Sequence, residues 1–169
     1  LEECETPAID EELKKSMAPN GEKILAHVSN FRKVKRICDV VDVFIKVRKK
    51  VPAKLMLVGD GPERHLAETK IREEGLADDL IVLGKVNDTG RVLSIADLFL
   101  LTSESESFGL AALEAMAVGV PVISSNTGGI PEVNDHGFSG YLSNVGDTAD
   151  MAKNALSLLK DEEKLELFK

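Results

Sequence analysis

Ser-Glu-Ser-Glu-Ser-Phe-Gly-Leu-Ala-Ala-Leu-Glu-Ala-Met-Ala, residues 103–117, joins an apolar run at 98–101 to an alanine-rich segment of helical character. Gly109 allows the backbone at the start of that helix to approach a ligand closely. The free N–H groups there carry about half a positive charge, which suits a phosphate. Glu106 precedes those amides, and Glu114 lies eight positions further on, where its side chain leans back toward the same site. Two carboxylates beside an anion site fit a ligand that also offers hydroxyls, such as a nucleotide sugar.

The segments on either side of this turn repeat one pattern, in which an apolar strand is followed by a short loop and a helix. We expect strands at 24–28, 54–58, 80–83, 98–101, 121–124 and 140–143. We expect helices at 37–47, 63–74, 89–96 and 108–118, a short turn or helix at 128–133, and two helices between 148 and 169. This alternation predicts an α/β fold with a Rossmann-like, doubly wound, parallel six-stranded sheet. Ligands bind such a sheet at the carboxyl ends of its strands, so the loops that matter are 29–35, 59–62, 84–88, 102–110 and 125–131.

The composition is typical of one globular domain. Of the 169 residues, 43% are hydrophobic and 30% are charged, and the formal net charge is -8. We interpret residues 1–20 as a lead-in or linker with room for a short helix, and residues 21–169 as the domain. No apolar run approaches the roughly 20 residues that a membrane span needs, and the first residues lack a signal-peptide pattern. We therefore expect a cytoplasmic protein without a membrane segment.

The charge distribution bears on the partners. An acidic balance argues against nucleic-acid binding, which needs clustered cations. One local exception is the basic cluster of Arg32, Lys33, Lys35 and Arg36. It can be a solvated helix start, although basic charge at a helix N-terminus opposes the dipole, and we favour an anion-binding role.

The two glutamates also have a structural interpretation. Glu114 can be an exposed helical residue, and Glu106 can be a charge that complements the helix dipole. Leu113 and Ala115 flank Glu114, however, and an ionised carboxylate in apolar surroundings needs a partner. We therefore favour a ligand contact for both.

The remaining reactive side chains do not suggest a metal centre or a nucleophile. Cys4 and Cys38 lack metal-ligand spacing, and we expect both to be free thiols. We interpret His27 as a strand residue with its hydrogen bonds satisfied, and His65 and His136 as surface residues. The chain has no Asp-x-Asp pair, no Walker loop and no Gly-x-Gly-x-x-Gly after its first strand. We expect no metal and no cofactor other than a substrate.

Several motifs together resemble those of one enzyme family. The segment 106–117 is similar to the E-x7-E signature of the retaining GT-B glycosyltransferases of family 4. Val58-Gly-Asp-Gly-Pro, Gly119-Val-Pro-Val and Gly128-Gly-Ile-Pro-Glu occur in the order usual for that family. The resemblance covers residues 24 to about 160, and it implies that this chain is the C-terminal, nucleotide-sugar-binding half of such an enzyme.

The resemblance also implies roles for individual residues. Glu106 is expected to meet hydroxyls of the donor sugar, and Glu114 the ribose hydroxyls. Lys35 matches the family lysine on the diphosphate, whereas Asn30 occupies the place of the family arginine. Arg32 lies two residues on, and whether it substitutes for that arginine is open. Further donor contacts are expected from Ser107, Phe108, Gly109, Leu110, Gly59, Lys85 and Val86, the last two beside the uracil ring.

The run 27–35 is most similar to one branch of the family, which implies a specific reaction. The full protein is expected to move N-acetylglucosamine from UDP-N-acetylglucosamine to L-malate, with retention and without a metal. L-malate would bind in an N-terminal domain, and we expect the 169-residue chain alone to be inactive. A different donor sugar or acceptor, a non-catalytic nucleotide-sugar-binding module, and association of identical chains stay open. A receiver-like signalling domain is disfavoured because Gly84 and Lys85 stand where its phosphorylated aspartate would be.

Overall fold

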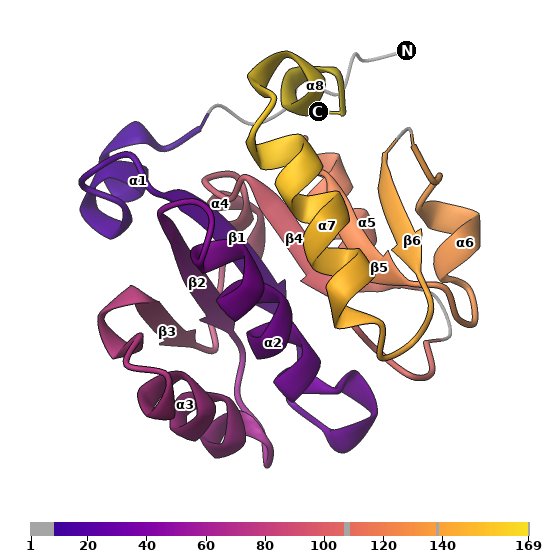
Figure 1. Cartoon of the computed structure of the whole chain (residues 1–169), viewed down its shortest axis with the longest axis horizontal. Coiled ribbons are helices and arrows are strands. Elements are labelled where there is room, and N and C mark those ends of the chain that lie inside the picture. The colour runs from indigo at the N-terminus through magenta and orange to yellow at the C-terminus, as the bar shows by residue number, and fades with distance from the viewer. Residues whose placement is uncertain (1–8, 107–108, 138, 169) are drawn as a thin grey trace.

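The computed structural model describes residues 9–106, 109–137 and 139–168, and its centre is a six-stranded sheet (Figure 1). The strand order is β3-β2-β1-β4-β5-β6, and every neighbouring pair is parallel. The strands are β1 (Lys23–Val28), β2 (Ala53–Val58), β3 (Leu80–Gly84), β4 (Leu98–Leu101), β5 (Val122–Ser125) and β6 (Gly140–Ser143). The predicted doubly wound parallel sheet is confirmed.

Helices connect the strands as the sequence pattern predicts. They are α1 (Glu11–Met17), α2 (Ile37–Arg48), α3 (Arg64–Glu73), α4 (Thr89–Leu93), α5 (Leu110–Ala117), α6 (Ile130–Val133), α7 (Thr148–Leu159) and α8 (Glu162–Phe168), with 3-10 turns η1 (Lys33–Lys35) and η2 (Ala77–Asp79). The predicted helix at 89–96 is too long by three residues, because α4 ends at Leu93. The Ser94 hydroxyl donates to the Arg91 carbonyl at 2.6 Å, a local bond that competes with helix continuation.

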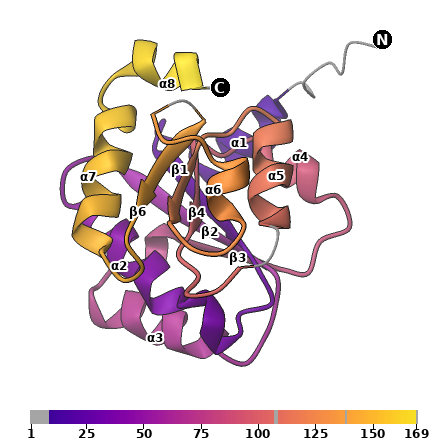
Figure 2. The same ribbon diagram turned by 90° about the vertical axis from the view of Figure 1, so that its right-hand side faces the viewer.

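The helices cover both faces of the sheet (Figure 2), and α2, α3, α7 and α8 lie on one face while α1, α4, α5 and α6 lie on the other. Successive strand residues point to opposite faces, so Leu25 and Leu55 join the first core while Ile24 and Met56 join the second. Burial on both faces explains why the central strands are continuously apolar.

The lead-in carries the short helix for which the sequence had room. Asp10 caps α1 by accepting the Leu13 N–H at 3.0 Å, and its carboxylate also accepts from Arg91. Leu13 and Met17 pack against the second core. Helix α1 thus lies on the sheet, while a domain boundary at residue 20 stays a prediction. In the described ranges, no helix combines the length and hydropathy that a bilayer crossing requires.

Candidate functional site

A pocket of about 460 Å³ opens at the carboxyl ends of β1 and β4. These strands are neighbours at the centre of the sheet, and the chain order reverses between them, which is where parallel sheets bind ligands. The pocket is lined by Val28, Ser29, Asn30, Lys35, Leu101, Ser105, Glu106, Leu110, Ala111 and Glu114. The loops after β1 and β4 and the first turns of α5 therefore build it together.

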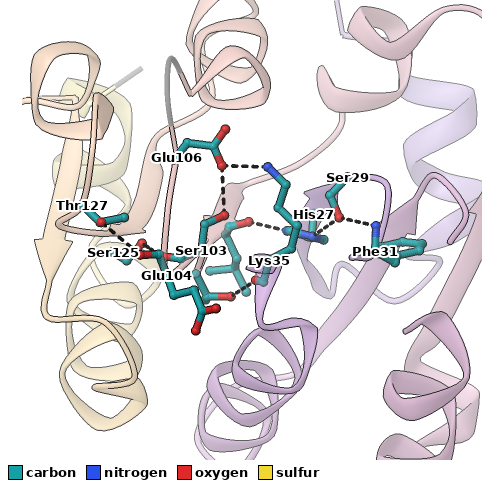
Figure 3. Close-up of polar contacts among 11 residues, drawn as sticks. His27, Ser29, Phe31, Lys35, Ser103, Glu104, Glu106, Ser125 and Thr127 are labelled. Atoms are coloured by element: carbon teal, nitrogen blue, oxygen red, sulfur yellow. Dashed lines mark hydrogen bonds and ion pairs between the residues drawn. The ribbon is translucent and has the colours of Figure 1, made fainter. Parts of the chain in front are cut away.

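An ion pair crosses the pocket between these two loops. The Lys35 ammonium lies 2.7 Å from Glu106 Oε2, and the same oxygen accepts the Ser103 hydroxyl proton at 3.0 Å (Figure 3). The side chains of Lys35 and Glu106 are 20% and 14% exposed. The carboxylate is thus held by two donors, while both charged groups remain open to the pocket.

The loop between β5 and α6 supports Glu106 from behind. The Gly129 N–H donates to the Glu106 carbonyl at 2.9 Å. Gly128 has φ +53°, and a Cβ there would lie 1.8 Å from the Glu106 carbonyl oxygen. The Thr127 hydroxyl donates to the Glu104 carbonyl, as Figure 3 shows. The Gly128-Gly129 pair therefore has a structural role, because a close backbone approach fixes the position of Glu106.

The loop after β1 is supported in the same way by the loop after β2. A Cβ at Gly59 would lie 1.9 Å from the Ser29 carbonyl oxygen, and one at Gly61 would lie 1.7 Å from the Asn30 carbonyl oxygen. Gly59 is not among the residues that line the pocket. The visible role of both glycines is to let this loop pack against the segment that carries Asn30, while a ligand contact by Gly59 stays a prediction.

Below the pocket, His27 connects β1 to β4. Its Nδ1 lies 2.8 Å from the Leu100 carbonyl oxygen, and its Nε2 lies 2.8 Å from the Ser29 hydroxyl. Burial lowers the pKa of His27 to about 4, because the charged imidazolium loses its hydration there. The expectation of a satisfied strand histidine is confirmed.

The basic cluster does not act as one unit. Lys35 pairs with Glu106, while Arg36 pairs with Asp39 at 2.6 Å and with Glu104 at 3.6 Å. Arg32 and Lys33 are exposed and form no ion pair within the described ranges. Arg32 is also absent from the pocket lining, so only Lys35 of the four cations lines the site.

The other predicted contacts divide between the pocket and its surroundings. Asn30, Leu110 and Glu114 line it with Lys35 and Glu106. Gly109 is the buried N-cap of α5 with φ +63°. Lys85 is exposed and Val86 packs against the second core, and neither lines the pocket. Ser107 and Phe108 lie outside the described residues.

The apolar neighbours of Glu114 do not bury its carboxylate, which contradicts the expectation from the sequence. Glu114 is not enclosed by its apolar neighbours, because α5 buries only Ala112 and Ala115. Leu113 is 42% exposed, and Glu114 itself is exposed at the pocket. Burial therefore does not require Glu114 to have a partner, and its candidacy rests on its place in the pocket lining.

Five lining residues were not among the individually predicted contacts, although Ser29 and Ser105 fall in the predicted loops 29–35 and 102–110; the five are Val28, Ser29, Leu101, Ser105 and Ala111. The signal was present, because each either ends a strand, follows one or begins α5. Side chains that could bind a metal do not gather in groups of three or more within the part of the chain that the structure describes. The site thus combines one lysine, two carboxylates and small polar groups.

Comparison with known protein families and curated proteins gives one consistent result. The family model described as "Glycosyl transferases group 1" matches residues 8–169. The chain is 54% identical over 143 residues to N-acetyl-alpha-D-glucosaminyl L-malate synthase of Bacillus anthracis. The aligned region covers 85% of this chain and 38% of that protein. It is 32% identical to 2-deoxystreptamine N-acetyl-D-glucosaminyltransferase of Niallia circulans, covering 70% of this chain and 32% of that protein. The chain therefore spans about a third of the length of these relatives.

Solved structures show the same relationship. A mutant of Staphylococcus aureus TarM, in complex with alpha-GlcNAc-glycerol and UDP, superposes with a TM-score of 0.81 at 26% identity, covering 87% of this chain and 30% of that one. Anabaena HepE in complex with UDP-glucose superposes with a TM-score of 0.84 at 25% identity, covering 93% of this chain and 44% of that one.

Proposed function

Because the chain belongs to the group 1 glycosyl transferases, we propose that it is the donor-binding half of a retaining, metal-independent glycosyltransferase that moves N-acetylglucosamine from UDP-N-acetylglucosamine to L-malate. The 54% identity to a protein named for that reaction supports this donor and this acceptor. The chain spans 38% of that relative, and we assign the acceptor pocket to the part of the enzyme that these residues do not include.

The observation that carries the proposal is the pairing of Lys35 with Glu106 at the sheet switch point. A nucleotide sugar offers an anionic diphosphate and neutral hydroxyls within one molecule. Lys35 suits the diphosphate, Glu106 suits hydroxyls of the transferred sugar, and Glu114 suits the ribose hydroxyls. All three line the same pocket.

The chemistry follows from charge development. When the glycosidic bond breaks, the UDP leaving group gains negative charge, and cations placed in advance stabilise it. Lys35 provides that charge at the pocket wall, and the N-terminal end of α5 adds the partial charge of its free amides. Arg32 can add a further cation only by reaching in from its exposed position.

Calorimetry with the 169-residue chain and UDP tests the donor assignment. We expect weak binding in the submillimolar to millimolar range, unchanged by Mg²⁺, and tighter binding of UDP-N-acetylglucosamine than of UDP-glucose. No heat at millimolar UDP would overturn the pocket assignment. An absolute requirement for Mg²⁺ would overturn the metal-independent mechanism, and equal affinities for the two sugars would overturn the donor preference.

Two alternatives differ in measurable ways. Another donor or acceptor within the family would bind UDP equally but transfer a different sugar. A non-catalytic binding module would show no turnover that Glu106→Ala or Glu114→Ala could remove in a protein that includes the acceptor half. The cytoplasmic location and association of identical chains stay predictions.

A further inference from the structure

His27 is a buried titratable residue with no role in the proposed reaction. Its ring is fully buried and stacks on two phenyl rings, with centroids 6.0 Å from Phe31 and 6.3 Å from Phe99. Both ring nitrogens are hydrogen-bonded, one to the Leu100 carbonyl and the other to the Ser29 hydroxyl, a contact that Figure 3 shows. The ring therefore joins the end of β4 to the first residue of a pocket loop.

The partners fix the proton on the ring. A carbonyl oxygen only accepts, so the Leu100 bond requires a proton on Nδ1. The low pKa of about 4 leaves the ring neutral at pH 7, and a neutral imidazole has only one N–H. Nε2 is then unprotonated, and it accepts the Ser29 hydroxyl proton at 2.8 Å.

Ser29 connects the His27 ring to the backbone of the pocket loop. Its oxygen accepts the Phe31 N–H at 3.1 Å, and Phe31 has φ +47°, a left-handed conformation that costs roughly 1–2 kcal/mol for a residue with a Cβ. The residue inside this turn is Asn30, and the same loop continues through η1 to Lys35. A strained turn of this kind persists only where its surroundings hold it.

We propose that His27 is a positioning residue for the donor site, because its unprotonated Nε2 holds the Ser29 hydroxyl, which in turn holds the Phe31 turn and so places Asn30 and Lys35 in the pocket. This inference rests on the proposed function for its ligand, UDP. The Ser29 proton points inward, so Ser29 offers the pocket a lone pair and no hydrogen-bond donor.

The first test needs no ligand. Long-range ¹H–¹⁵N correlation spectra of the labelled chain at pH 7 report the protonation of each histidine nitrogen. We expect His27 to show a protonated Nδ1 and an unprotonated Nε2. A ring protonated on Nε2, alone or with Nδ1, overturns the inference whether or not the chain binds UDP.

The second test separates positioning from stability. Ser29→Ala removes the acceptor of the Phe31 N–H, and His27→Asn retains a donor for Leu100 but is too short to reach Ser29. We expect each to weaken UDP binding by about five- to tenfold, as loss of a hydrogen bond in a semi-buried site predicts. Amide exchange at Phe31 should accelerate in both variants, and this readout does not depend on UDP.

Two variants serve as controls, and all are compared under conditions where circular dichroism shows them folded. Ser29→Thr retains the hydroxyl and should keep UDP affinity within threefold. Phe99→Leu removes one of the two ring contacts of His27 and retains its hydrogen bonds, and it should lower stability but leave UDP affinity within twofold. Equal losses of affinity in Phe99→Leu and Ser29→Ala, or unchanged Phe31 exchange in Ser29→Ala, would show that His27 contributes only to stability. Absence of UDP binding by the unmodified chain would instead refute the proposed function.

Discussion

The ammonium nitrogen of Lys35 lies 2.7 Å from Oε2 of Glu106, a residue 71 positions away in the chain. The Glu106 carboxylate, which we assign to the sugar hydroxyls, neutralises the Lys35 ammonium, which we assign to the diphosphate. A ligand that brings both phosphate and hydroxyls satisfies both side chains at once. A ligand that brings phosphate alone competes with Glu106 for Lys35.

Glu106→Gln should therefore change the affinities for UDP and for the intact donor in opposite directions. The variant frees Lys35, so UDP should bind about three- to fivefold more tightly, since a partly exposed ion pair contributes about 1 kcal/mol. UDP-N-acetylglucosamine should bind more weakly, because the sugar hydroxyls lose a charged acceptor. Parallel calorimetric titrations with the two ligands measure both effects.

Glu104→Gln is the matched control for this prediction. It removes the same charge two residues away, but Glu104 pairs with Arg36 and does not line the pocket. Both ligands should keep their affinities within twofold in that variant. A loss of UDP affinity in Glu106→Gln would contradict the competition between Glu106 and the diphosphate.

The open question of Arg32 has its own test. Arg32 and Lys33 are adjacent, exposed and outside the pocket lining. Each should therefore affect UDP binding to a similar extent, through long-range charge. If Arg32 reaches the diphosphate, Arg32→Ala should weaken UDP binding at least fivefold more than Lys33→Ala. Because Arg32 is exposed, we expect instead that both variants lose less than threefold in UDP affinity at 150 mM salt, where screening is strong. Isothermal titrations of the two variants and of Lys35→Ala distinguish these results.

The fold was predictable because its signals are local. Apolar runs, helical spacing in 37–47 and glycine punctuation each act over a few residues. The alternation of strands and helices then leaves one sheet topology with right-handed connections. The position of the pocket followed as well, because a rule of parallel sheets links it to the strand ends.

Of the predicted contacts, Asn30, Lys35, Glu106, Leu110 and Glu114 line the pocket, whereas their arrangement in space was not predictable from the sequence. No local pattern indicates that Lys35 and Glu106 form an ion pair, or that Gly128 packs on the Glu106 carbonyl, since each contact joins distant segments. The apolar neighbours of Glu114 suggested burial, yet α5 packs through its alanines and leaves Glu114 exposed. Which face of a helix is covered depends on tertiary packing, and a short alanine-rich helix carries little signal for it.

Gly128→Ala should damage the site more than a comparable change elsewhere. A Cβ at Gly128 would lie 1.8 Å from the Glu106 carbonyl oxygen, whereas one at Gly137, with φ +81°, meets nothing within 4 Å. Gly137→Ala should therefore cost only the roughly 1–2 kcal/mol of a left-handed backbone. Gly128→Ala should cost clearly more and also weaken binding of the intact donor at least tenfold. Urea unfolding and calorimetry on both variants test this, and equal stabilities with unchanged affinity would contradict it.

His27 also makes stability depend on pH. Its pKa is lowered by burial from 6.5 to about 4 in the folded chain, and Lys35 and Glu106 are the charged groups that act on it, with opposite effects. The unfolded chain therefore binds more protons between these two values. By linkage, the free energy of unfolding is fully retained above pH 6.5 and falls as the pH decreases toward 4.

From pH 6.5 to pH 4.5 this histidine should remove about 2–3 kcal/mol from the free energy of unfolding, at about 1.4 kcal/mol per pH unit. His27→Gln removes the titrating group, so its stability should fall less over the same range, although it starts lower at pH 7. Losses from carboxylates such as Asp79 are common to both proteins; burial alone would raise the pKa of Asp79, but its hydrogen bonds from Lys54 and Arg48 outweigh this and lower it. Urea unfolding of both proteins at half-unit pH steps isolates the difference, and parallel curves would show that His27 is not the neutral buried ring described above.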